Sequence, residues 1–174
     1  QPTLDSATLE LSIATRARAI HCQCWSTAMG NLPNATTMTS SSRIIDSPIG
    51  PLKLTVEHDA LIGVDWAAPS EPILNEHAPE AGALDRVESE LSRYFAGELE
   101  QWSLELALDG TEFQQSVWAA LQNIPEGTTS TYQKIAAAIG KPSAVRAVGS
   151  AIGSNPIPVI VPCHRVIGSN GSLT

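Results

Sequence analysis

The sequence predicts an α/β protein of the α+β type, in which a small sheet domain precedes a helix-turn-helix domain. Before residue 110, apolar and polar residues alternate over several short segments, as they do in half-buried strands. After residue 110, apolar residues recur at helical spacing, and Gly and Pro separate short helices. The 174 residues suffice for two small domains. We therefore expect domains at 43–110 and 111–174.

Residues 43–110 are expected to form a sheet with one helix. Apolar residues between Leu84 and Phe95 recur at helical spacing, and Gly97 ends this helix. A tight turn at 47–50 separates the first two expected strands. The expected strands cover residues 44–45, 52–56, 61–64 and 102–108.

Three helices are expected in the second domain. Capping boxes at 111–114 and 130–133 open the first two, and Gly140 ends the second. Ser143 is the expected cap of the third helix, whose apolar positions are Val145, Val148 and Ile152. Two short helices joined by a Gly-containing turn are typical of a helix-turn-helix, although many helical hairpins never contact DNA.

The charge of the chain is unevenly distributed. The net charge is −8, and residues 1–126 hold all 18 Asp and Glu. Residues 127–174 hold four cations, Lys134, Lys141, Arg146 and Arg165, and no acidic residue. Because phosphate repels carboxylates, this segment is either a polyanion-binding face or a chance gap in a small sample.

The polar face of the third helix favours the first alternative. Arg146, Gly149, Ser150 and Gly153 share one side of the helix. Each glycine inside a helix costs up to ~1 kcal/mol relative to alanine, which makes sense where another molecule approaches the backbone closely. A helix side with one long cationic side chain and otherwise only small residues can fit into a groove of a nucleic acid. Packing of another helix against the small residues is the alternative.

The segment most informative about chemistry is Val161-Pro162-Cys163-His164-Arg165-Val166. Cys163 follows a rigid proline at the end of the apolar, strand-like run 157–161. A cysteine is a nucleophile only as a thiolate, which a neighbouring base such as His164 helps to form. A lone cysteine after an apolar run is often inert packing. The proline, the histidine and the helices upstream favour a nucleophile here.

Residues 1–42 are unlike the rest and are expected to be a disordered or mis-assigned extension, with the true start at Met38. His21, Cys22 and Cys24 resemble part of a zinc site, but no second Cys pair follows, so no metal is expected. No apolar stretch approaches the ~20 residues of a membrane span, and no signal peptide is recognisable. An odd number of cysteines, three, favours a reducing, cytoplasmic location.

Four parts of the second half form a specific combination: Tyr132, Arg146-Ala-Val-Gly149, Asn155-Pro156 and Pro162-Cys163-His164-Arg165-Val166. Taken together, they resemble the O6-alkylguanine-DNA alkyltransferases, the methylated-DNA–protein-cysteine methyltransferases of direct DNA repair. The resemblance covers Arg43 to the end and is strongest from Phe113 onward.

The resemblance implies a ribonuclease-H-like sheet domain and a helix-turn-helix (winged-helix-like) domain that carries the reactive cysteine. Such proteins bind the minor groove of double-stranded DNA as monomers, flip the alkylated guanine, and transfer its O6-alkyl group irreversibly to cysteine. O4-alkylthymine is a further possible substrate, and no cofactor is needed. His164 would take the thiol proton through a water.

The resemblance also implies roles for residues around this pair. Arg146 would fill the place of the flipped base, with Gly149 and Ser150 beside it on the DNA-facing side. Tyr132 would help to rotate the nucleotide. Asn155 would brace the turn near the site, and Ile152 and Val166 would line the base pocket.

One departure from the family pattern bears on activity. Family members continue with a glycine-rich loop bearing a second tyrosine and a helix whose glutamate orients the histidine, whereas this sequence stops at Thr174. We therefore expect a fragment with weak or no activity. The alternative functions are a non-catalytic lesion sensor, although sensors carry tryptophan in place of the cysteine, and a helix-turn-helix regulator. A thiol protease or redox enzyme lacks support from the surrounding sequence.

Overall fold

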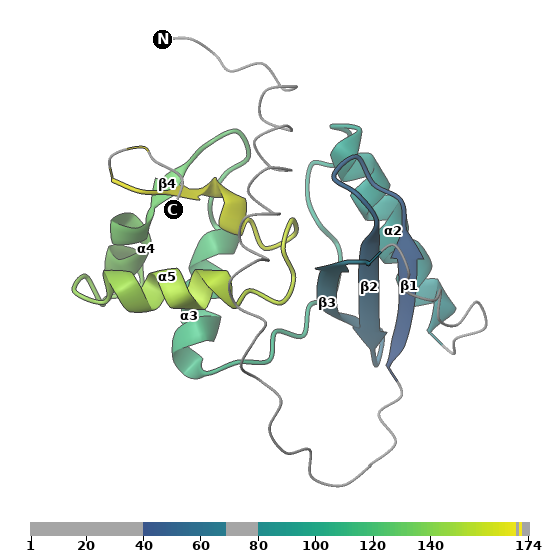
Figure 1. Ribbon diagram of the computed structural model, residues 1–174, viewed down its shortest axis with the longest axis horizontal. Helices are drawn as coiled ribbons and strands as arrows, with labels where there is room; N and C mark the ends of the chain where they lie inside the picture. The colour runs from purple at the N-terminus through teal and green to yellow at the C-terminus, as the bar shows by residue number, and fades with distance from the viewer. Residues whose placement is uncertain (1–39, 69–79, 170, 172–174) are drawn as a thin grey trace, which may run out of the picture. The chain divides into compact units, whose positions relative to one another are not determined.

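The structure is a computed structural model that describes residues 40–68, 80–169 and 171 (Figure 1). The described residues fall into two compact units, and the chain passes from the first unit to the second between Asp109 and Gly110. The predicted extension, with its zinc candidates and Met38, lies outside the described residues, except for its last three positions.

The first unit is an antiparallel sheet of three strands covered by one helix (Figure 1). The strands are β1 (Ser41–Ile45), β2 (Leu52–Glu57) and β3 (Ala60–Trp66), and β2 lies in the middle. The helix α2 (Ala81–Phe95) contacts all three strands. Regular structure thus starts two residues before the predicted boundary at Arg43. The alternation in β2 places Leu52, Leu54 and Val56 fully inside the core.

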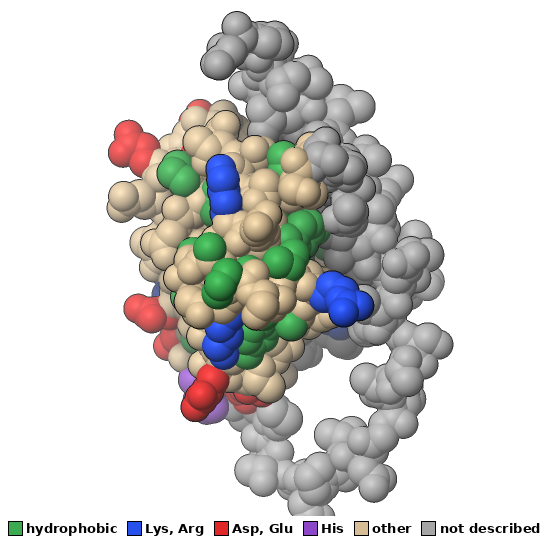
Figure 2. Space-filling view, turned by 90° about the vertical axis from the view of Figure 1, so that its left-hand side faces the viewer, with side chains coloured by type: hydrophobic (Ala, Val, Ile, Leu, Met, Phe, Trp, Pro, Cys, Tyr) green, Lys and Arg blue, Asp and Glu red, His purple; other side chains and the backbone are tan. Residues whose placement is uncertain are grey.

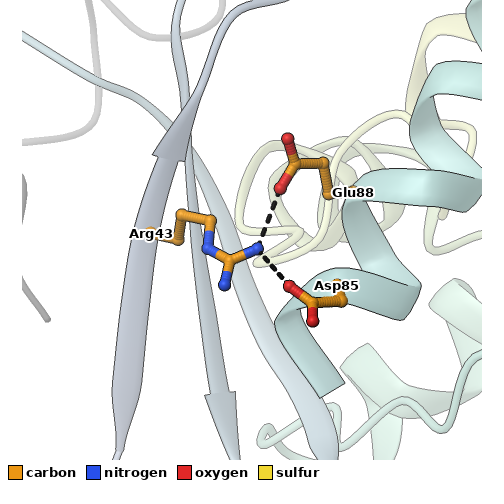
Figure 3. A network of polar contacts seen from close by, with 3 residues as sticks. All are labelled: Arg43, Asp85 and Glu88. Carbon is orange, nitrogen blue, oxygen red and sulfur yellow. Dashed lines mark hydrogen bonds and ion pairs between the residues drawn. The ribbon is translucent and has the colours of Figure 1, made fainter. Parts of the chain in front are cut away.

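Arg43 connects the outer strand to the helix (Figure 3). Its Nη1 lies 2.6 Å from Asp85 Oδ1 and 2.9 Å from Glu88 Oε2 on α2. Hydrogen bonds to Asp85 and then to Glu88 raise the pKa of Arg43 above its ordinary value. Partly exposed pairs of this kind contribute only about 0–1 kcal/mol each, so they orient α2 more than they stabilise it.

The prediction of a fourth strand at residues 102–108 is wrong. This segment is extended and its side chains alternate in exposure, but within the described residues it makes a single bridge, Leu61 to Leu106, with β3. Ser103 instead donates its backbone N–H and its hydroxyl to the buried carboxylate of Glu90 on α2. Alternating apolar and polar residues indicate that one face of an extended segment is buried. They do not indicate whether a neighbouring strand is present to form a hydrogen-bonded pair.

The second unit consists of three helices and a short parallel strand pair. The helices are α3 (Glu112–Gln122), α4 (Tyr132–Ala138) and α5 (Val145–Gly153). A 3-10 turn, η1 (Cys163–Arg165), precedes β5 (Val166–Ile167), which pairs with β4 (Ser130–Thr131).

Of the three predicted caps, one is confirmed. Thr111 and Gln114 form the reciprocal capping box of α3. The cap of α4 is Thr131, whose hydroxyl accepts from Lys134 N at 3.2 Å, because the strand pairing takes up Ser130. The N-cap of α5 is Ala144, with no side-chain hydrogen bond, so Ser143 was predicted wrongly.

Trp118 holds α3 against α5. Its side chain is 1% exposed, and its Nε1 donates to Ala151 O at 2.8 Å. Gly110 lies against the same ring: a Cβ built there would come within 2.6 Å of Trp118 Cη2. The glycine just before α3 is therefore required by the space that the indole occupies.

We predict that Gly110→Ala destabilises the protein by ~1–3 kcal/mol, the usual cost of overpacking a closely packed site. Urea unfolding followed by circular dichroism measures the loss. Gly153→Ala is the control, because a Cβ there has no neighbour within 4 Å. Equal stability of the two variants would show that the indole moves aside without cost.

Candidate active site

The segment before Cys163 is a buried turn, and the prediction of a strand-like run at 157–161 is wrong. The Asn155 side chain fills this turn: its Oδ1 accepts from Ile157 N at 3.1 Å and its Nδ2 donates to Val161 O at 2.9 Å. Val161 N in turn donates to Ile157 O at 3.0 Å. Asn155 therefore braces the turn, replacing the strand partner that a run of apolar residues alone would need.

Val159 lies at the tip of this turn with a φ of 76°. A β-branched residue rarely adopts this left-handed conformation, because its side chain crowds the following carbonyl. Its side chain is nevertheless 3% exposed and part of the core. Burial of the valine and the Asn155 hydrogen bonds together hold the backbone in a conformation that the residue itself disfavours.

The turn leads directly to the candidate nucleophile. Cys163 is a reduced thiol at the start of η1, and both it and His164 are half-buried. Cys163 N donates to Val161 O at 2.8 Å, so the cysteine follows closely on the carbonyl that Asn155 binds. A half-buried cysteine followed in sequence by a histidine is suited to supply a nucleophile towards a substrate brought to the surface of the unit.

The strand pair brings α4 close to the nucleophile segment. Ser130 pairs with Val166 and Thr131 with Ile167, in parallel. Tyr132 directly follows β4, and its ring lies 3.8 Å from the position that a Cβ on Gly149 would occupy. Pairing between segments more than 30 residues apart thus places Tyr132 beside both α5 and the segment that follows Cys163.

The proposed DNA-facing side of α5 is largely exposed. Arg146 and Ser150 are exposed, and Ser150 Oγ donates to Arg146 O at 3.4 Å. Gly149 is partly covered by Tyr132, yet an alanine would make only an ordinary contact there, so packing within the unit does not require the glycine. Figure 2 shows Lys and Arg side chains among hydrophobic and polar surface over α4 and α5, with Asp and Glu towards its edges.

The three predicted pocket residues differ in burial. Ile152 and Val166 are each 4% exposed and belong to the core, while Asn155 is half-buried and contacts backbone groups. The sequence analysis did not predict the structural roles of three residues. These are the contact of Trp118 with α5, the positive φ of Val159 and the hydrogen bond of Arg165 to Ile124 O. The Arg165 guanidinium donates through Nη1 to Ile124 O at 2.9 Å. A conformation such as that of Val159 leaves no signal in a single sequence.

Among the described residues, no group of three or more His, Cys, Asp or Glu side chains could hold a metal ion. Within the same ranges, no helix has the length and hydrophobicity to cross a membrane.

Comparison with known families covers both units. Residues 112–174 match the family model of the 6-O-methylguanine DNA methyltransferase DNA binding domain, and residues 42–108 match that of the ribonuclease-like domain of the same enzymes. The chain belongs to this family. The predicted fold, a small sheet domain followed by a helical DNA-binding domain, is therefore confirmed.

Relatives with this family name are similar over most of their length. The methylated-DNA–protein-cysteine methyltransferase of Mycobacterium tuberculosis is 50% identical over 133 residues, 76% of this chain and 81% of the relative. The relative from Methanosarcina barkeri is 47% identical over 138 residues, 75% of this chain and 84% of its own.

Solved structures agree with these matches. The crystal structure of M. tuberculosis O6-methylguanine methyltransferase has a TM-score of 0.66 and 46% identity, covering 78% of this chain and 82% of that one. The structure of M. tuberculosis OGT in complex with DNA has a TM-score of 0.64 and 48% identity, covering 76% and 81%.

The strain at Val159 predicts an unusual order of stability. At a buried position with ordinary backbone angles, glycine is less stable than alanine by ~0.5–1 kcal/mol. At Val159 the positive φ penalises alanine, so we expect Val159→Gly to be at least as stable as Val159→Ala.

Urea unfolding of both variants measures this order. Val148, fully buried in α5, is the matched control, since alanine should be more stable than glycine there. The same order at both sites would show that Val159 is not strained.

Proposed function

We propose that this protein repairs DNA directly, by transferring the alkyl group of O6-alkylguanine to the Sγ of Cys163. The carrying observation is the half-buried Cys163-His164 pair on a braced turn, in a chain about 50% identical to proteins named methylated-DNA–protein-cysteine methyltransferase. The activity is that of a methylated-DNA-[protein]-cysteine S-methyltransferase, and the alkyltransferase is favoured over the lesion sensor because Cys163 is present.

The transfer is a substitution at carbon. His164 takes the thiol proton, and the Cys163 thiolate attacks the alkyl carbon. The S–C bond forms as the O6–C bond breaks, and the electron pair of that bond stays with the guanine, which receives a proton. The products are unmodified guanine and a thioether on Cys163. Because a thioether is a poor leaving group, each protein molecule reacts once, and the balance requires no cofactor.

The second unit supplies the DNA contacts in this proposal. The exposed side of α5 enters the minor groove, where Gly149 and Ser150 allow close approach to the duplex. Arg146 fills the place of the flipped base, and Tyr132 helps to rotate the nucleotide. Flipping costs a few kcal/mol, and less for a poorly paired alkylguanine, so the lesion itself contributes to selectivity.

Because Ile152 and Val166 are buried, we assign them a supporting role and not the lining role that the family resemblance implies. Ile152 and Val166 support the base pocket from within the core, and Asn155 holds the turn that forms its wall. O4-alkylthymine remains a second candidate substrate. We also propose that the family matches mark two domains, at 43–110 and 111–174, and that the protein acts as a monomer in the cytoplasm, with alkylated double-stranded DNA as its partner.

We predict that incubation with a duplex containing one O6-methylguanine adds one methyl group to the peptide that holds Cys163. Intact and peptide mass spectrometry measures the gain, and Cys163→Ser is the control that should gain none. A protein that binds the duplex but gains no methyl would contradict alkyl transfer by this chain and would favour the two alternatives, the lesion sensor and the inactive fragment.

We predict that Arg146→Ala slows transfer from duplex DNA at saturating protein by at least ~10-fold, since stabilisation of the flipped state is lost. Transfer from O6-methylguanine as the isolated base should stay unchanged, because that substrate needs no flipping. Lys134→Ala, which removes an exposed cation from α4, should weaken binding but leave the rate at saturation unchanged. Equal slowing with both substrates would contradict the role of Arg146.

A further inference from the structure

We infer that Arg165 is a positioning residue for alkyl transfer: its guanidinium fixes the nucleophile turn against the loop that leads to Tyr132. This inference rests on the proposed function, because it assigns the residue a part in that same reaction.

Arg165 differs from the other three cations of residues 127–174. Lys134, Lys141 and Arg146 are exposed, whereas Arg165 is half-buried and donates to the backbone carbonyl of Ile124 at 2.9 Å. Hydrogen bonds from a charged donor are shorter and stronger than those between neutral groups. Arg165 is thus engaged within the unit, and the sequence-based assignment of all four cations to one polyanion-binding face does not extend to it.

The acceptor is itself fixed. Ile124 lies two residues after the last residue of α3, its side chain is 7% exposed, and its N–H donates to Leu121 O at 3.0 Å. Its backbone is therefore tied to the end of a helix whose Trp118 is anchored to α5. An arginine that donates to such a carbonyl fixes the segment that carries the arginine relative to α3.

That segment is the nucleophile turn. Arg165 is the last residue of η1, and its N–H donates to Pro162 O at 3.1 Å, across Cys163 and His164. Upstream, Asn155 holds the turn through Val161 O. Downstream, the turn continues into β5, which pairs with β4. The Arg165 side chain adds a tertiary hydrogen bond, to Ile124 O, on this second side of the cysteine.

The same contact fixes the approach to Tyr132. The chain between Ile124 and β4 is a loop, turned by Thr128, whose hydroxyl donates to Pro125 O at 2.7 Å. This loop leads through β4 into Tyr132 at the start of α4. One guanidinium thus connects the segment that carries the nucleophile to the segment that carries the base-rotating tyrosine. Substitution at carbon needs the sulfur aligned with the O6–C bond, and ~1 Å of misplacement costs up to ~100-fold in rate.

The test compares Arg165→Met, which keeps length without donors, with Arg165→Lys, which keeps one donor group and the charge. The first readout is the rate of methyl transfer from O6-methylguanine as the isolated base, which carries no phosphate. The second is affinity for an undamaged duplex. Arg93→Met is the matched control, because Arg93 also donates to a backbone carbonyl after a helix, Glu98 O at 3.4 Å, but in the first unit.

We expect Arg165→Met to react with the isolated base at least ~10-fold more slowly than the natural protein, Arg165→Lys to recover part of the rate, and Arg93→Met to react normally. A rate for Arg165→Met within ~2-fold of the natural protein would overturn the inference. A defect confined to duplex DNA would also overturn it, and would make Arg165 a phosphate contact. If Arg165→Met does not fold, Arg165→Lys decides: a folded, slower variant supports the inference, and an unchanged rate overturns it.

A separate arm distinguishes failure of this inference from failure of the proposed function. If the natural protein gains no methyl group from either substrate, the proposed function fails. The role of Arg165 is then tested by the rate of Cys163 alkylation with iodoacetamide as a function of pH. Arg165→Met should change this profile while Arg93→Met does not, and identical profiles would overturn the positioning role.

Discussion

The site depends on the side-chain amide of Asn155. By binding Ile157 N and Val161 O, the amide pairs the N–H of a buried residue and adds a second donor to a carbonyl that also accepts from Cys163 N. An unpaired buried backbone group costs ~1–3 kcal/mol, so loss of this amide would leave the Ile157 N–H without this partner and would favour opening of the turn. Cys163, the proposed nucleophile, follows two residues after Val161, so this turn sets its position. The structural Asn155 thus governs the placement of the Cys163 thiol.

The strain at Val159 has the same origin. A tight turn that must return the chain to Cys163 needs one residue in the left-handed region, where glycine would fit without cost. The chain has valine there, and its side chain is buried. At Val159, burial of the side chain favours valine, whereas the positive φ disfavours it. The hydrogen bonds of Asn155 help to hold the turn in this conformation.

Helix packing supplies the second constraint on the site. Trp118 joins α3 to α5 through Ala151 O, which also accepts from Ser154 Oγ at 3.1 Å. Gln114, part of the cap of α3, donates to the same Ser154 hydroxyl at 2.9 Å. The end of α5 is thereby held to the beginning and middle of α3. Since Asn155 follows this end directly, the helix that presents Arg146 and the turn that presents Cys163 share one anchor.

The sequence by itself determined the order of elements, the helical nature of the second unit and the adjacency of the candidate pair Cys163 and His164, because hydrophobic period, caps and residue type are local properties. Only the tertiary structure decided what the extended runs become. Residues 102–108 and 157–161 both look like strands locally, but a strand also requires a partner, and here the partners are a single bridge to β3 and the amide of Asn155. Likewise Arg165 counts as a surface cation in the sequence, and only the fold brings the Ile124 carbonyl within its reach. Pairing across 30 or more residues is set by the whole chain, so no local pattern encodes it.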